Sequence, residues 1–245
     1  MVNLLAAELL KLKRSRMLLL SLLGAAIAPI MVVLAFYINK HSEIHNEPAD
    51  LAVLFYNTSM YTVLLIGVPL YTVVTAYLFN REYVENTLEN LLTLPVGRTT
   101  LMLSKMLMLM LWILLLSLVA WVLTLLLGLL GGFGGLSGSL ILHSLSAFVL
   151  AGLFLFALST PVILITVMMK NYVPPIIFAL SITLINVLAY NSEHRGLVPW
   201  TAAFDIAQGT LLPTYPAAVS YGIIAAMSVG GCIATLLYFR KVDVN

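Results

Sequence analysis

Long apolar runs separated by short polar stretches dominate the pattern of this chain. Six runs reach, or nearly reach, the roughly 20 apolar residues that a helix needs to cross a hydrocarbon core. They are Met17–Ile38, Leu51–Phe79, Leu101–Leu130, Leu140–Met169, Tyr172–Tyr190 and Pro216–Phe239. Because the runs are continuously apolar, they predict helices and not the alternating strands of a barrel. The pattern therefore predicts an all-α integral membrane protein with six transmembrane helices.

Composition agrees with this class of protein. Hydrophobic residues make up 62% of the 245 residues and charged residues only 9%, which is far outside the range of soluble domains. We interpret residues 1–245 as a single transmembrane domain. The only cysteine, Cys232, has no partner in the chain, so the sequence predicts neither an intrachain disulfide nor a cysteine-based metal cluster.

The N-terminal segment allows more than one interpretation. Its basic residues and the apolar run after them imitate a signal peptide with a cleavage site after Ala28. Pro29 directly after that site, and the continuation of the run to Ile38, argue for an uncleaved first span. Apolar residues at helical spacing within residues 1–16 predict an interfacial helix, although a basic flank that merely orients the first span fits equally well.

The positions of the lysines and arginines predict the orientation. With six spans and both termini cytoplasmic, ten of the twelve cations fall on the inner side, and only Lys40 and Arg195 fall outside. The ten are Lys11, Lys13, Arg14, Arg16, Arg81, Arg98, Lys105, Lys170, Arg240 and Lys241. The net charge of +2 is therefore a signature of topology and does not indicate nucleic acid as a partner.

Two outer segments contain residues with possible functions. Residues 191–215 are interrupted by glycines and prolines and cannot cross lipid as one helix, so we expect short interfacial or re-entrant helices that form an outer lid, anchored by Trp200. The first outer loop holds four potential metal ligands: His41, Glu43, His45 and Glu47. Because they lack the rigid spacing of known zinc motifs, we expect a flexible polar loop and no metal site.

A polar segment lies between the second and third runs, at residues 80–99. From Glu82 to Leu94 it reads as an amphipathic helix, with Glu82, Glu85 and Glu89 on one face and apolar residues on another. Pro95 and Gly97 then end the helix. Helices that lie on lipid usually carry a basic polar face, so an acidic face favours burial of the apolar side in a protein groove.

This segment resembles the cytoplasmic loop of ATP-binding-cassette permeases of the type-2 exporter family. The likeness rests on Glu82, Asn86-Thr87, Leu88, Leu91-Leu92, Pro95-Val96, Arg98 and Ser104-Lys105. Asn86 and Gly97 depart from the family pattern, which often has Gly and Ser at these positions. The layout is most similar to small bacterial members that serve bacitracin and lantibiotic immunity or peptide export.

The resemblance implies a permease subunit in the bacterial plasma membrane that exports a hydrophobic or amphipathic substrate, such as a peptide antibiotic or toxin. Residues 80–99 would be the coupling loop that docks on a separate ATPase subunit, present in two copies, beside a second permease chain. The implied docking residues are Glu82, Glu85, Leu88, Glu89, Leu91, Leu92 and Pro95. ATP and Mg²⁺ would bind the partner, since the sequence has no G-x-x-x-x-G-K-[ST] phosphate loop and no cofactor motif of its own.

Non-transporting functions form the alternative. Gly135–Gly138 matches the G-x-S-G of intramembrane proteases, but the only nearby base, His143, follows six residues after Ser137. A membrane sensor or scaffold would use the polar loop to recruit a different partner. Secondary transport is disfavoured, because the six predicted runs contain no Asp, Glu or Arg.

Overall fold

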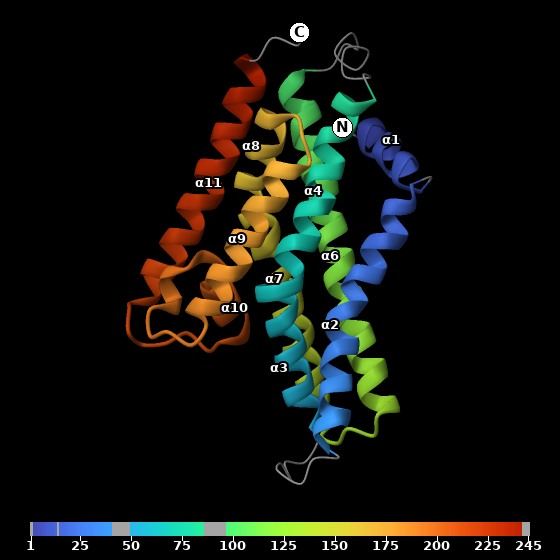
Figure 1. Ribbon diagram of the computed structural model, residues 1–245, viewed down its shortest axis with the longest axis vertical. Coiled ribbons are helices and arrows are strands. Elements are labelled where there is room, and N and C mark those ends of the chain that lie inside the picture. The colour runs from blue at the N-terminus through green and yellow to red at the C-terminus, as the bar shows by residue number, and fades with distance from the viewer. Residues whose placement is uncertain (1, 14, 41–49, 86–96, 242–245) are drawn as a thin grey trace.

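The computed structural model describes residues 2–13, 15–40, 50–85 and 97–241, which form a bundle of helices (Figure 1). The helices are α1 (Val2–Lys13), α2 (Arg16–Lys40), α3 (Leu51–Tyr61), α4 (Gly67–Val84), α6 (Arg98–Leu130), α7 (Gly138–Leu158), α8 (Thr160–Met169), α9 (Val173–Ala189), α10 (Pro199–Gln208) and α11 (Ala217–Lys241). A π-helical turn, η1 (Thr62–Ile66), joins α3 to α4, and a short 3₁₀ turn, η2 (Arg195–Leu197), precedes α10.

Five helical stretches in the described residues are long and apolar enough to cross a membrane. They are Arg16–Ile38, Leu51–Val84, Arg98–Leu130, Gly138–Met169 and Ala217–Lys241. The sixth predicted run is α9, which is apolar but only 17 residues long. The prediction of an all-helical, multi-span fold is confirmed, and the helix bounds lie close to the predicted runs except that α4 continues past Phe79 to Val84.

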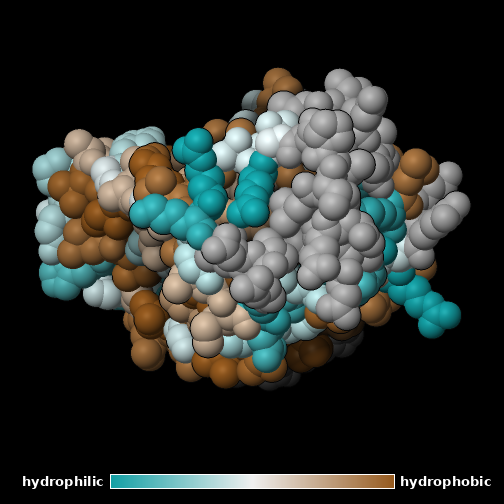
Figure 2. Space-filling model, turned by 90° about the horizontal axis from the view of Figure 1, so that it is seen from above, coloured by the Kyte–Doolittle hydropathy of each residue, from teal (hydrophilic) through white to brown (hydrophobic). Residues whose placement is uncertain are grey.

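The chain returns repeatedly to the same end of the bundle. Figure 1 places α1, the end of α4, the start of α6, the α8–α9 turn and the end of α11 together at one end, which we call the α1 end. The α6–α7 turn lies at the opposite end. Figure 2 looks onto the α1 end, where hydrophilic residues gather in the middle of the face and hydrophobic residues flank them. This distribution suits a protein whose sides face lipid and whose ends face water.

The main core lies between α4 and α6 and extends to α8 and α10. Leu109, Ile113 and Leu116 on α6 are fully buried, and Trp112 beside them donates a hydrogen bond from Nε1 to Ser21 Oγ of α2 at 3.1 Å. On α4, Tyr71 reaches Ser117 Oγ of α6 through its hydroxyl at 3.2 Å. These contacts fix α2, α4 and α6 side by side.

The π-helical turn η1 interrupts the second long helix in its interior. Gly67 follows it, and a Cβ at this position would lie 2.1 Å from the backbone oxygen of Thr62, so only glycine fits. Within the described part of the chain, the buried hydroxyls of Thr58, Ser59 and Thr62 around the turn have no hydrogen-bond partner. Asn186 of α9 donates a hydrogen bond to Leu64 O at 3.4 Å, so α9 contacts the π-helical turn η1 itself.

Between α9 and α11 the chain forms the short helices η2 and α10. Helix α10 packs against α7, α11 and η1, and most of its residues are buried. Trp200 is only 6% exposed and belongs to the main core. Trp200 therefore contacts protein, where we expected an anchor at the lipid interface.

Candidate functional site: the charged cluster at the α1 end

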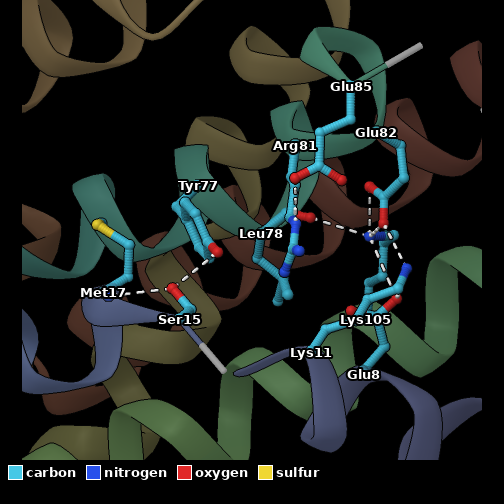
Figure 3. Close-up of polar contacts among 10 residues, drawn as sticks. All are labelled: Glu8, Lys11, Ser15, Met17, Tyr77, Leu78, Arg81, Glu82, Glu85 and Lys105. Atoms are coloured by element: carbon cyan, nitrogen blue, oxygen red, sulfur yellow. Dashed lines mark hydrogen bonds and ion pairs between the residues drawn. The ribbon is translucent and has the colours of Figure 1, made fainter. Parts of the chain in front are cut away.

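Four charged side chains meet where α1, α4 and α6 converge, at the base of the polar segment. Glu8 and Lys11 come from α1, Glu82 comes from the last turn of α4, and Lys105 comes from the first turns of α6 (Figure 3). We call these residues the charged cluster. Two acids and two cations balance, so the cluster carries no formal net charge.

Lys105 and Glu82 form its centre. Lys105 Nζ lies 2.6 Å from each carboxylate oxygen of Glu82 and donates a third hydrogen bond to Leu78 O at 2.9 Å. The exposed fraction is 4% for Lys105 and 2% for Glu82. An ammonium group has three donors, and all three have an acceptor here. This pair joins the helix before the polar segment to the helix after it.

Helix α1 adds the second pair of charges. Lys11 Nζ lies 3.5 Å from Glu82 Oε1 and 3.6 Å from Glu8 Oε1, and Glu8 Oε1 is also 3.6 Å from Lys105 Nζ. These contacts are longer than those of the central pair, and Lys11 is partly exposed. They connect α1 by charge to both of the other helices.

A second group of polar contacts lies beside the charged cluster. Tyr77 of α4 donates a hydrogen bond to Ser15 Oγ at 2.8 Å, and Ser15 Oγ also accepts from the backbone N–H of Met17 at 3.0 Å. Ser15 therefore caps the start of α2 and ties it to α4. Arg81 and Glu85, by contrast, form an exposed pair within one stretch of chain, with Nε 2.8 Å from Oε1.

The docking residues implied by the resemblance fall into two groups. Leu88, Glu89, Leu91, Leu92 and Pro95 lie outside the described residues. Glu85 caps the end of α4 and is exposed.

Glu82 differs from our expectation. It belongs to the last turn of α4 and does not begin a separate helix, and its carboxylate points inward to Lys105. The physical reason is that Lys105, four residues from the point at which the next apolar run begins, neutralises Glu82 and lets α4 extend beyond Phe79.

Sequence reasoning noted Lys105 as one of the inner cations and as part of the family signature, but it did not pair Lys105 with Glu82. A usable signal existed, because Glu82 and Lys105 are charges at facing ends of two consecutive apolar runs in a chain that has few charges. Burying such a charged residue near the membrane costs free energy unless it forms an ion pair with an opposite charge. The contribution of Glu8 and Lys11 depends on how α1 folds back, which the pattern of α1 alone does not indicate.

Of the other possible sites, the structure describes the glycine-rich turn with Ser137 and His143. Ser137 Oγ accepts a hydrogen bond from Leu140 N at 3.2 Å and caps α7, while His143 is exposed on the same helix. The possible metal ligands of residues 41–47 lie outside the described residues. Elsewhere in the described chain, no group of three or more His, Cys, Asp or Glu side chains could hold a metal ion.

The charged cluster lies at the base of the segment that carries the permease signature, and comparison with known proteins agrees with that signature. Residues 4–186, which are most of the chain, match the family described as ABC-2 family transporter protein. The chain belongs to the ABC-2 transporter family. This ABC-2 permease is also 47% identical over 206 residues to the bacitracin transport permease protein BCRB of Bacillus licheniformis, a match that covers 84% of this chain and 99% of the relative. It is therefore the multi-pass membrane subunit of an ABC transporter.

Proposed function

We propose that this permease exports a hydrophobic or amphipathic peptide antibiotic of the bacitracin class, driven by a separate ATPase subunit. The observation that carries the proposal is the 47% identity to a bacitracin transport permease along 99% of its length. In this proposal two ATPase subunits bind ATP and Mg²⁺, and a second permease chain, identical or different, completes the pathway.

We further propose that the α1 end is cytoplasmic and that residues 86–96 dock on the ATPase subunit. Arg81, Arg98, Lys105, Lys170, Arg240 and Lys241 all lie in helices or turns at the α1 end, which supports this orientation under the positive-inside rule. Leu88, Leu91 and Leu92 would be the apolar anchors, Glu85 and Glu89 would face basic residues of the ATPase, and Pro95 would end the docking helix. Residues 191–215 would form the lid on the extracellular side.

Docking can be tested by co-purification. The tagged permease is extracted from native membrane in mild detergent, and accompanying proteins are identified by mass spectrometry. We expect a protein with a Walker A phosphate loop that is lost from the Leu88→Asp/Leu91→Asp double variant. Leu136→Asp is the matched control, because Leu136 is an exposed leucine in the α6–α7 turn at the opposite end. Retention of the ATPase by the double variant would contradict docking through this segment.

The cargo can be tested in cells that are sensitive to bacitracin. Expression of the permease together with its ATPase should raise the bacitracin concentration that stops growth, whereas the permease alone should not. If the pair protects against no cyclic peptide antibiotic although the complex forms and hydrolyses ATP, the assignment of the cargo is wrong while the assignment as a permease stands.

A further inference from the structure

We propose that Glu82 and Lys105 are positioning residues, which hold the two chain ends that flank residues 86–96 at a fixed spacing and connect them to α1. The inference rests on the proposed function, because a fixed spacing matters for transport only if force enters at this segment. It also assigns Glu82 a position inside the permease and not on the surface that meets the ATPase.

The geometry of Lys105 favours a fixed connection. Its three donors are used by two oxygens of Glu82 and by Leu78 O, all within 2.9 Å. A lysine on the surface exchanges such partners with water, but this ammonium group is buried and has no donor left. Because all three acceptor atoms belong to Leu78 and Glu82 of α4, Lys105 of α6 is held against a single turn of α4.

Stability alone does not account for such a pair. Removing two charges from water costs free energy that their attraction often fails to repay, so apolar residues of similar volume commonly stabilise a protein as well or better. In some proteins a buried pair instead fixes the alignment of the elements that carry it, and we infer that role here. Here the elements are the last turn of α4 and the first turns of α6, and the residues between them include the predicted docking segment.

Glu8 and Lys11 extend the connection to α1. Each lies within 3.6 Å of an opposite charge of the central pair. A displacement of either flank would therefore also separate Glu8 from the buried Lys105 and Lys11 from the buried Glu82. The three helix ends should move together when the segment between α4 and α6 is pulled.

A distance measurement on the permease alone tests the fixed spacing. Spin labels are attached to Val84→Cys and Gly97→Cys in a Cys232→Ala background, since both positions are exposed and flank residues 86–96. We expect a narrow distance distribution that broadens in Glu82→Gln, in Lys105→Met and in the Glu82→Gln/Lys105→Met double variant. Arg240→Gln removes an exposed charge at the same end and should leave the distribution narrow. An unchanged width in all three cluster variants would overturn the proposal.

A second readout separates positioning from folding. The neutral double variant leaves no unpaired member of the central pair, so it should recover the yield and ATPase binding that the single variants lose. If the pair positions the helices, cargo-stimulated ATP turnover stays lost in the double variant. Recovery of that turnover would mean that the pair only neutralises charge, which overturns the proposal. Failure of the unmodified permease to bind an ATPase would contradict the proposed function, and the distance distributions would still decide whether the spacing is fixed.

Discussion

Arg195 and Asp205 form a buried ion pair, with Nε 2.8 Å from Oδ2, that fastens η2 to α10. Asp205 is 1% exposed, and its Oδ1 also accepts a hydrogen bond from the hydroxyl of Thr210 at 3.1 Å. Burial raises the pKa of the Asp205 carboxyl above its ordinary value, and the attraction of Arg195 and the hydrogen bond of Thr210 offset that shift only in part. Asp205 therefore connects α10 to Arg195 before the helix and to Thr210 after it. Burial of the charged pair costs desolvation free energy.

Replacing Asp205 by Asn should destabilise the permease by about 3 kcal/mol, because the change leaves the largely buried Arg195 charge without the Asp205 carboxylate. The thermal midpoint of the purified protein in detergent measures this loss. Glu193→Gln is the control, since Glu193 is an exposed acid in the same segment and its loss should change stability by less than about 0.5 kcal/mol. Equal midpoints for the two variants would show that the ion pair does not hold α10.

A second prediction concerns the close approach of α8 and α11. A Cβ on Gly231 would lie 2.6 Å from Thr160 Oγ1 and 2.8 Å from the backbone nitrogen of Pro161, whereas a Cβ on the neighbouring Gly230 would meet nothing within 4 Å. Gly231→Ala should therefore cost about 1 to 3 kcal/mol through overpacking. Gly230→Ala should be neutral or slightly stabilising because alanine favours the helix. The ranking of the two thermal midpoints checks the prediction, and a reversed order would refute it.

The π-helical turn η1 gives a third prediction. Gly67→Ala places a methyl group against the oxygen of Thr62, which the fixed backbone cannot avoid without losing the turn. We expect destabilisation by about 2 kcal/mol, in the range of substitutions that strain a special backbone site. Gly222→Ala on α11, where a Cβ would meet nothing, is the matched control. A fully stable Gly67→Ala variant would imply that α3 and α4 can join as a regular α-helix without the π-helical turn.

Ser15 supplies a fourth prediction, because its hydroxyl both caps α2 and accepts from Tyr77. Ser15→Ala should cost about 1 to 2 kcal/mol through loss of the cap and of the half-buried acceptor for Tyr77. Tyr77→Phe removes only one of these bonds and should cost about 1 kcal/mol. Tyr221→Phe, at an exposed position of α11, should change little. Chemical unfolding of the three variants should preserve this order, and a larger loss in Tyr77→Phe than in Ser15→Ala would contradict it.

The long helices could be predicted because lipid requires every backbone group in a span to bond within its own helix. The apolar runs thus mark where α2, α6 and α11 lie to within a few residues. The end of α4 was missed for a physical reason. Arg81 and Glu82 look like the start of a polar loop, but Lys105 compensates Glu82 from a neighbouring helix.

The charged contacts between helices could not be read from the pattern. Glu82 and Lys105 are 23 residues apart, and their meeting depends on the rotation and height of α4 against α6. The same holds for Arg195 and Asp205, which meet because η2 packs against α10. Hydrophobic periodicity indicates which face of a helix is buried, but it carries no information about the register between two helices.

The π-helical turn was also beyond the sequence pattern. Residues 62–66 read Thr-Val-Leu-Leu-Ile and suit a regular helix as well as a π-turn. Gly67 was a weak signal, since glycine is common in membrane helices for several reasons. In the structure, the contact of Asn186 of α9 with Leu64 O and the close approach of Gly67 to Thr62 O mark this position.

The balance of charge in the cluster has a consequence for how the protein is made. In the proposed orientation, Lys11 and Lys105 belong to the cations that orient the chain during insertion, a stage at which acidic residues have little influence. In the folded protein Glu8 and Glu82 neutralise these two lysines. In the proposed orientation, the same two lysines thus first keep their ends of the chain in the cytoplasm during membrane insertion. After α1, α4 and α6 have assembled, they form the ion pairs of the mature transporter.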